Sequence, residues 1–329
     1  MAGYISETRD YKTAIVSAID KASKTLTDNI FQANPLSAVL LKKGKMVPQA
    51  GGERIYKLIE YEKNNTIAPI ARGGNVNLAT SEKRTKAIYD WVTYPGSVTK
   101  YYEEVKEIRG PYQLRNLVTD ELNNLVSTFS ETFEGELFAD GTTFAGKGMD
   151  GLEVAVPYTA AWAVGQSWGG LNPTAGSQTY WRNQTATMTG VSFAANWDQY
   201  FMTMDQDIIQ QNGKTDLIVT NAEQFRYYKT ECLGLKSIAY KTYLGDMGFQ
   251  EVEYEGRPIV WSRSCGADRF YFLDTNHLYI TYDPSRWFDR RGWVPKQDTL
   301  DEVNIIVCTW AFTGDKRKAQ GIIAEIDTD

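Results

Sequence analysis

The sequence predicts an α+β fold, and three observations lead to this class. An unbroken apolar stripe predicts one long helix over residues 112–140, and residues 53–108 have the β-branched and aromatic pattern of extended strands. The second half of the chain then mixes short helices with short strands, without an internal repeat. With 329 residues, 42% of them hydrophobic, the chain is long enough for about two packed domains.

The first 34 residues have the composition of an arm. A thin apolar stripe at helical spacing stands among polar residues, and it has no partner nearby in the sequence. Its members are Tyr11, Ile15, Ile19, Ala22, Leu26 and Ile30. Pro35 interrupts this pattern. We therefore expect the stripe to pack against something else.

The next segment predicts a thin, two-stranded finger. Runs of strand-forming residues over 55–61 and 88–94 flank a polar stretch, residues 64–80, that contains Pro69 and two glycines. Such a pair of strands is too thin to hold a core of its own, so it should project from the body. Pro95 and Gly96 predict a turn that leads into a further strand over 97–105.

The long helix has the clearest pattern in the chain. Proline at position 111 suits the first helical position, and Gly141 suits the end of the helix. The apolar stripe consists of Leu114, Val118, Leu122, Leu125, Phe129, Phe133 and Leu137. The opposite, polar face is expected to carry Asp120, Glu121, Asn124, Glu131, Glu134 and Glu136. A helix of this length is a rod of about 40 Å and implies an elongated scaffold.

The second half should contain two capped helices and three turn-linked strand pairs. Asn196 and Asn221 are the expected N-caps, with a strand over 217–219 between the two helices. The expected pairs are 249–254 with 258–261, 270–273 with 278–282, and 304–312 with 321–326.

Charge and composition exclude several classes of function. The net charge of −6 leaves no basic footprint for nucleic acid, so any contact with DNA should be weak. Three widely separated cysteines offer neither a disulfide framework nor a zinc site, and a single histidine excludes multi-histidine metal sites. That residue, His277, follows a turn-like Asp-Thr-Asn and is expected at a hairpin tip. Without a signal sequence or a membrane-length apolar run, we expect a soluble cytoplasmic protein that does not enter membranes.

Two segments resemble catalytic motifs without meeting their requirements. Residues 141–148 nearly spell a phosphate-binding loop, but Gly148 replaces the Ser or Thr that would reach magnesium, and a helix precedes the loop where a strand is needed. Residues 152–157 after it are expected to be extended. Glu103 and Glu104 would point to opposite faces of a strand, which suits a solvated edge better than an acid/base pair. We expect no catalytic residue, no cofactor and no metal, with an aromatic-lined carbohydrate-active enzyme as the remaining enzymatic alternative.

Aromatic side chains on the thin strands have two interpretations. They are either exposed for contact with a partner protein or packed against neighbouring strands within the chain. The residues concerned are Trp91, Tyr94, Tyr101 and Tyr102.

The order of these elements resembles the major capsid proteins of tailed phages, which share the shell fold first seen in the Hong Kong phage. Local sequences agree from about residue 50 onward. The agreeing positions are Gly151 and Leu152 after the long helix, Gly169 and Gly170, the run Trp181, Arg182 and Asn183, the segment 216–221, and Gly256 with Pro258.

The resemblance implies a Hong Kong 97-like fold in five parts. These are an N-terminal arm (1–45), an extended β-loop with flanking strands (46–110), a spine helix in the peripheral domain (111–150), an axial domain (151–290) and a return to the peripheral domain (291–329). In such a fold, the expected assembly interface on the extended loop and its flanks is Ile67, Pro69, Ile70, Arg72, Trp91, Tyr101 and Tyr102. No long segment precedes the arm as a built-in scaffold, which implies either a separate scaffolding protein or earlier removal of such a segment.

The implied function is structural. The chain would assemble with itself, as hexamers and pentamers, into an icosahedral shell around double-stranded DNA in a bacteriophage virion built in the host cytoplasm. A scaffolding protein, a portal and decoration proteins are the implied partners. A bacterial encapsulin-type compartment uses the same fold and is the first alternative.

Overall fold

The computed structural model describes residues 35–62, 66–67, 69–70, 72–75, 83–102, 111–158, 167–174, 178–233, 251–297 and 299–326. The helical stripe predicted within the first 34 residues lies outside this part, as do Glu103 and Glu104. Within it, helices and strands are mixed, which confirms the α+β class. The strands form one five-stranded sheet, one six-stranded sheet and one two-stranded ribbon.

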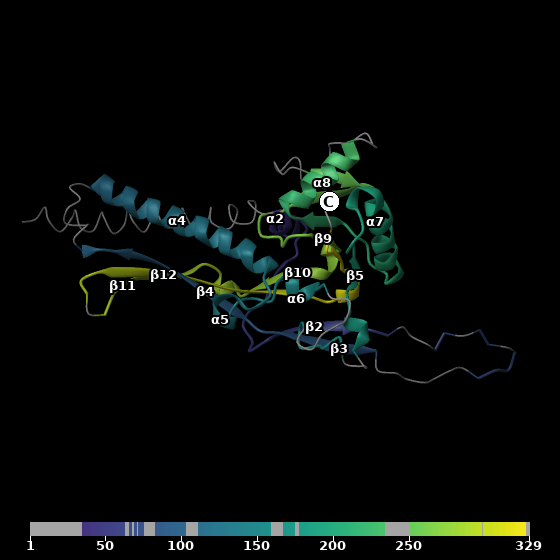
Figure 1. Ribbon diagram of the computed structural model, residues 1–329. Coiled ribbons are helices and arrows are strands. Elements are labelled where there is room, and N and C mark those ends of the chain that lie inside the picture. The colour runs from purple at the N-terminus through teal and green to yellow at the C-terminus, as the bar shows by residue number, and fades with distance from the viewer. Residues whose placement is uncertain are drawn as a thin grey trace, which may run out of the picture.

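The five-stranded sheet is organised around its longest strand, β12 (Glu302–Gly314). Its first part pairs with β4 (Val92–Lys100) on one edge and with β11 (Asp289–Pro295) on the other, both antiparallel. Its last part pairs with β10 (Leu278–Tyr282), which pairs in turn with β1 (Met46–Pro48) in parallel. The strand β12 thus runs the length of the elongated part of the molecule (Figure 1).

The six-stranded sheet has the order β5-β13-β9-β6-β8-β7. These strands are β5 (Gln184–Thr187), β13 (Gly321–Ala324), β9 (Arg269–Leu273), β6 (Leu217–Thr220), β8 (Arg257–Trp261) and β7 (Glu251–Tyr254). Alternate residues of a strand point to opposite faces of a sheet. Both faces of this sheet are buried, because each one packs into an apolar core. Along β6, Ile218 faces one apolar core and Leu217 and Val219 face the other.

The helices distribute between these two cores. The helices α7 (Phe193–Gln210) and α8 (Ala222–Leu233) carry residues of the second core, such as Trp197, Phe201 and Tyr228. The first core contains residues of α2 (Pro35–Lys42), α4 (Pro111–Phe138) and α6 (Leu152–Ala155). The shorter elements are α5 (Thr143–Gly146), η1 (Thr179–Trp181), η3 (Thr275–His277), η4 (Pro284–Arg286) and η5 (Arg317–Ala319).

The long helix is confirmed as α4, which begins at Pro111 and has 28 residues, about 42 Å of helix. It runs away from α7 and α8 along the five-stranded sheet (Figure 1). Gly96 of β4 permits this packing, because a Cβ atom at this position would lie 2.5 Å from the Phe129 ring. The turn predicted at Pro95 and Gly96 is therefore wrong: both residues lie inside an edge strand, where proline is tolerated.

Two of the three predicted strand pairs are wrong. The strands β7 and β8 pair as expected, but β9 and β10 belong to different sheets, and so do β12 and β13. Short 3-10 turns, η3 and η5, carry the chain from one sheet to the other at these points. His277 therefore lies at a crossover between sheets and not at a hairpin tip. The apolar pattern of each segment predicted a strand, but this pattern does not specify which other strand it pairs with.

Local predictions in the second half had mixed outcomes. Asn221 caps α8 as expected, since its Oδ1 accepts the Gln224 amide at 2.8 Å. Asn196 does not cap α7, which begins earlier at Phe193 after Ser192. Residues 152–155 form the helix α6 where an extended segment was expected. Glu136, predicted on the polar face of the long helix, is 2% exposed.

Candidate assembly surface

The two-stranded ribbon consists of β2 (Ile55–Glu60) and β3 (Arg84–Tyr89), paired antiparallel. A two-stranded ribbon was predicted, but its second strand was expected at 88–94, and residues 92–94 belong instead to β4 of the five-stranded sheet. It lies beside the body and leads to a loop that extends away from it (Figure 1). Ile55, Ile59, Ala87 and Tyr89 point inward and are buried in the first core. The ribbon therefore has one face that the body covers.

Three aromatic contacts fix the root of the ribbon to the body. The Tyr89 hydroxyl donates to the Gly314 carbonyl at 2.7 Å and accepts from the Gly314 amide at 3.2 Å, and burial raises the pKa of Tyr89 well above its usual range. Tyr61 stacks on Tyr180 with ring centroids 4.5 Å apart. Lys57 lies 4.7 Å above the Tyr279 ring, and burial lowers the pKa of this lysine. The direction of the ribbon is thus set by the folded body.

The outer face of the ribbon carries three exposed apolar side chains next to charged ones. Tyr56 and Leu58 are 56% and 55% exposed, and Ile88, the cross-strand partner of Tyr56, is 37% exposed. We call these three residues the outer ribbon patch. Contiguous exposed apolar side chains of this size are typical of surfaces that another protein covers. The sequence analysis did not identify this patch. Adjacent apolar residues such as Ile55 and Tyr56 were the available signal, because neighbouring residues of a strand point to opposite faces of the ribbon.

Four of the expected interface residues lie on the loop beyond the ribbon. Ile67 is 88% exposed and Ile70 is 52% exposed, while Pro69 and Arg72 are also exposed. The loop therefore presents apolar side chains to its surroundings.

The expected aromatic residues of the interface separate into two groups. Trp91 is half-buried, packs against the first core and donates its indole N–H to the Gly52 carbonyl at 3.0 Å. Tyr94 is likewise half-buried against that core. Tyr101 and Tyr102, by contrast, are 51% and 50% exposed.

Tyr101 and Tyr102 lie beyond the end of β4, away from the ribbon. The Tyr102 amide donates to the Asp301 carboxylate at 3.0 Å, which places these rings beside the turn between β11 and β12. Leu300 in that turn is 75% exposed and Val294 on β11 is 47% exposed. These exposed apolar residues lie at the end of the five-stranded sheet where β4 ends and β12 begins, and the sequence analysis named only Tyr101 and Tyr102 among them.

The glycines and aromatic residues singled out by the sequence resemblance act as internal supports. A Cβ atom on Gly151 would lie 2.4 Å from the Glu136 carbonyl oxygen and 2.7 Å from the Ala139 amide nitrogen, so the chain can leave α4 only with glycine here. The next residue, Leu152, is fully buried. These two positions fold the exit loop tightly against the end of α4.

A second pair of glycines supports the ribbon directly. Gly169 and Gly170 have φ values of +62° and +70°, which favour glycine. The Gly169 carbonyl accepts from the Ile88 amide at 2.8 Å, and a Cβ atom on Gly169 would lie 2.8 Å from the side chains of Ala87 and Tyr89. This turn is held in place by Trp181, whose indole N–H donates to the Trp168 carbonyl at 2.8 Å. The motif therefore braces β3 from its free edge.

The remaining residues of the resemblance stabilise loops and a turn. Arg182 donates to the Pro173 carbonyl at 2.9 Å, and Asn183 donates to the Pro157 carbonyl at 3.1 Å. Gly256, with φ of +76°, completes the tight turn between β7 and β8, and Pro258 is buried in β8.

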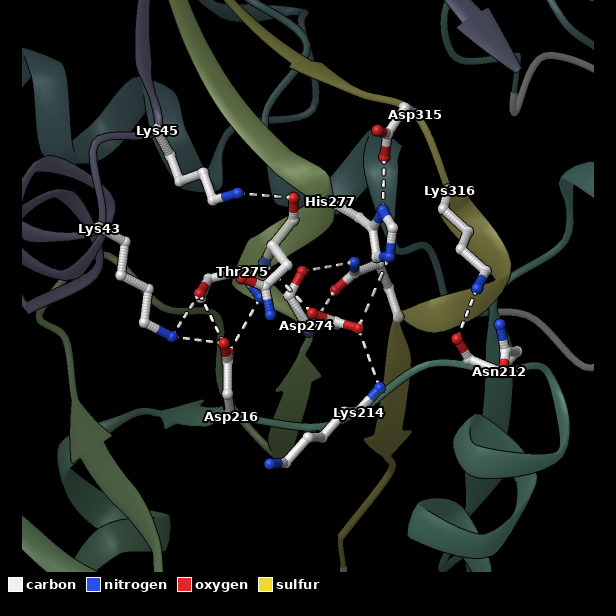
Figure 2. A network of polar contacts seen from close by, with 12 residues as sticks. Lys43, Lys45, Asn212, Lys214, Asp216, Asp274, Thr275, His277, Asp315 and Lys316 are labelled. Atoms are coloured by element: carbon white, nitrogen blue, oxygen red, sulfur yellow. Dashed lines mark hydrogen bonds and ion pairs between the residues drawn. The ribbon is translucent and has the colours of Figure 1, made fainter. Parts of the chain in front are cut away.

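A polar network joins the two sheets at the crossover η3 (Figure 2). Lys43 pairs with Asp216 and donates to the Thr275 hydroxyl at 2.8 Å, and Lys45 donates to the Asn276 carbonyl at 3.0 Å. On the other side, the His277 Nδ1 lies 2.7 Å from the Asp315 carboxylate. The His277 carbonyl also accepts from the Asp315 amide, and the His277 amide donates to the Asp274 carbonyl. His277 thus connects η3 to the end of β12.

The segment that resembles a phosphate-binding loop does not offer its amides to a ligand. The Gly146, Lys147 and Gly148 amides donate to the carbonyls of Thr142 and Thr143 at 2.9–3.2 Å. Within the described ranges, no group of three or more His, Cys, Asp or Glu side chains could hold a metal ion. The helices of the same ranges include none that is long and apolar enough to cross a membrane.

Comparison with solved structures defines the class of fold. The capsid protein of cyanophage A-1(L) aligns with 86% of this chain and 90% of its own, with a TM-score of 0.64 and 14% sequence identity. The capsid protein of an empty GTA particle aligns with 87% of this chain and 89% of its own, with a TM-score of 0.55 and 12% identity. This chain therefore has the fold of phage capsid proteins.

The same fold extends to an encapsulin. The SrpI encapsulin of Synechococcus elongatus PCC 7942 aligns with 87% of each chain, with a TM-score of 0.53 and 11% identity. No model of a known protein family matches the sequence, and no curated protein matches it.

Proposed function

We propose that this chain is the major capsid protein of a tailed bacteriophage, with a Hong Kong 97-like fold. It would assemble as hexamers and pentamers into an icosahedral shell that encloses double-stranded DNA. The observation that carries this proposal is the ribbon: the body fixes its root, while its outer patch of Tyr56, Leu58 and Ile88 is left open. A surface of this kind is stabilised when a neighbouring copy covers it.

The division into parts belongs to the same proposal. Residues 1–45 would be the arm, 46–110 the extended loop, 111–150 the spine helix, 151–290 the axial domain and 291–329 the peripheral return. The strands of the two sheets cross these sequence limits, since β10 lies in the five-stranded sheet and β13 in the six-stranded one.

The partners we propose follow from a container role. These are other copies of the chain, a scaffolding protein, a portal, decoration proteins, and packaged DNA that is held weakly. The net charge of −6 supports weak contact, because an acidic wall does not retain a polyanion. The shell would be part of the virion and would be assembled in the bacterial cytoplasm. We assign the chain no catalytic role and no cofactor.

Electron microscopy with light scattering on the purified full chain tests the proposal. We expect closed particles, or rings of five and six copies, at high concentration or under crowding. The variant Leu58→Lys, which places a charge on the outer ribbon patch, should abolish them. The matched variant Met202→Lys changes a side chain that is 46% exposed on α7, outside the outer ribbon patch, and should assemble normally. Because a missing scaffolding protein would also leave the chain monomeric, the contradicting outcome is particle formation that Leu58→Lys leaves unchanged, which would show that the outer ribbon patch has no part in assembly.

An encapsulin-type compartment is the second candidate, and the fold shared with the SrpI encapsulin supports it. The contents of particles isolated from the native source separate the two. Double-stranded DNA inside the shell favours the phage capsid, whereas a protein cargo without DNA favours the compartment.

A further inference from the structure

The strand β2 has one edge that the described chain leaves unpaired. The Tyr61 amide donates to the Lys83 carbonyl at 3.1 Å, which fixes the alternation of hydrogen bonds between β2 and β3. In this alternation, the backbone groups of Tyr56, Leu58 and Glu60 point away from β3. Among the described residues, none donates to or accepts from these backbone groups on that side. The edge of β2 thus offers a row of N–H and C=O groups.

The edge of β2 also lacks the features that protect other edges of this molecule. In the five-stranded sheet, the outer strand β4 contains Pro95, and the outer strand β11 shifts register between Arg290 and Trp293. Proline and bulges discourage the addition of a further strand. The six residues of β2 include no proline, and their register with β3 is regular. A further strand can therefore pair with β2.

A groove of about 1350 Å³ lies beside this edge. Leu58 and Glu60 of β2 line the groove, whereas Lys86, the cross-strand partner of Leu58, does not. The body contributes Asn212 and Lys316 to the lining, and Lys316 donates to the Asn212 carbonyl at 2.6 Å (Figure 2). Neighbouring strands of a sheet lie about 4.8 Å apart, so a strand added to β2 would lie along this groove.

Most carboxylates that line the groove already have partners. Glu60 forms an ion pair with Arg84 at 2.6 Å, and the Asp315 carboxylate lies 2.7 Å from the His277 Nδ1. Glu62 is the remaining carboxylate of the lining.

Three lysines of the same groove, by contrast, have no such partner. Lys83, Lys316 and Lys318 line the groove, and none of them forms an ion pair with a described residue. Burial, followed by the charge of Lys318, lowers the pKa of Lys316. An acidic segment in the groove would compensate these positive charges, which the chain itself leaves uncompensated.

We propose that the edge of β2 binds an extended segment of a partner protein, antiparallel to β2, in which apolar and acidic side chains alternate. Its apolar side chains would lie beside Tyr56 and Leu58 on the outer face, and its carboxylates would point to the other face, toward the lysines of the groove. In strand addition, backbone hydrogen bonds provide affinity and alternate side chains provide specificity. The site belongs to a single chain and does not depend on shell assembly.

Peptide binding to the purified, unassembled full chain tests this proposal. The peptide is a fluorescein-labelled heptapeptide of alternating valine and glutamate, and fluorescence anisotropy measures its dissociation constant. We expect one peptide per chain, bound at least tenfold more tightly than the same peptide with lysine in place of glutamate. N-methylation of the valines removes the N–H groups offered to Tyr56 and Leu58 and should weaken binding at least tenfold. N-methylation of the glutamates, whose N–H groups face away from β2, should change it less than threefold.

Two pairs of variants place the site on the chain. Glu60→Pro removes an N–H group from the β2 edge and should weaken binding at least tenfold, whereas Lys86→Pro removes one from β3 and should change it less than twofold. Lys318→Glu should weaken binding at least fivefold. Its control, Lys147→Glu, changes an exposed lysine outside the groove and should have no effect. Circular dichroism checks that each variant is folded.

Four outcomes would overturn the proposal. These are no binding of the acidic peptide, equal binding of the acidic and basic peptides, equal effects of the two methylations, and binding that neither Glu60→Pro nor Lys318→Glu weakens. In addition, a dimer of the peptide-free chain that Glu60→Pro abolishes would assign this edge to a second copy instead of a partner protein.

Discussion

The hydroxyl of Tyr94 on β4 donates a hydrogen bond of 2.5 Å to the buried carboxylate of Glu136 on α4. The same carboxylate accepts from the Thr143 hydroxyl at 2.6 Å and from the Met149 amide at 2.7 Å. One acidic side chain therefore ties the long helix to an edge strand and to both ends of the loop that follows the helix. Burial, followed by the bond to Glu136, raises the pKa of Tyr94 above its usual range, so this hydroxyl stays protonated and continues to donate.

Glu136→Gln should lower the free energy of unfolding by about 2 kcal/mol, because hydrogen bonds to a buried charged group are worth roughly 1.5–3 kcal/mol each and the amide cannot accept all three. Denaturant titration followed by tryptophan fluorescence measures the change. Glu131→Gln is the control, since Glu131 lies on the same helix with 72% of its side chain exposed, and it should shift stability by less than about 0.5 kcal/mol. Equal losses in both variants would argue against the buried network.

Gly151→Ala should destabilise the fold by about 2 kcal/mol or more, because the added methyl group meets backbone atoms of α4 that cannot move aside. Gly135→Ala is the matched control. Nothing lies within 4 Å of a Cβ atom at this position inside α4, so alanine should be neutral or stabilise the helix by about 0.5–1 kcal/mol. Thermal unfolding of the two variants side by side separates close approach from the general effect of replacing a glycine.

Deletion of residues 65–78 should leave a folded monomer that cannot form closed particles. The ribbon root is held by Tyr89, Lys57 and Tyr61, and all three lie outside the deletion. Circular dichroism checks the fold and electron microscopy checks the particles. Normal shells from the deleted chain would show that the loop has no part in assembly.

The buried thiols should make stability fall at alkaline pH. Burial raises the pKa of Cys265 and of Cys308 to about 12, from an ordinary value of about 9. Each thiol must lose its proton more easily in the unfolded chain than in the folded one. The contribution of each protonated thiol to the free energy of unfolding is therefore fully present below pH 9. As the pH rises toward 12, the free energy of unfolding falls by about 1.4 kcal/mol per pH unit. Unfolding measured from pH 8 to 11 should show a shallower decline for Cys265→Ala than for the unsubstituted chain.

The same burial predicts slow thiol chemistry. In a Cys232→Ser background, a thiol reagent at pH 8 should label neither remaining cysteine until denaturant is added. Both are free and buried in the structure. Rapid labelling of the folded chain would show that one of these sites opens.

Elements with a strong local signal were predictable. The stripe of α4 and the proline at its start predicted a long helix. The strand-forming runs over 55–61 and 88–94 predicted a ribbon, although its second strand lies at 84–89. The cap at Asn221 and the pair of β7 and β8 also follow from residues close together in sequence. In each case a short stretch of chain contains all the groups that determine the geometry.

The sequence by itself thus determined where the long helix, the strands of β7 and β8 and the cap at Asn221 lie, and it predicted that a thin ribbon would need a partner. Tertiary structure alone decided that β9 and β10 separate into different sheets, since apolar alternation specifies a buried face but no partner strand. It also decided that Glu136 is buried. The helix pattern placed that carboxylate toward solvent, and only the tertiary structure, with donors from Tyr94 on β4 and from Thr143 and Met149 in the returning loop, provides the hydrogen bonds that make its burial favourable.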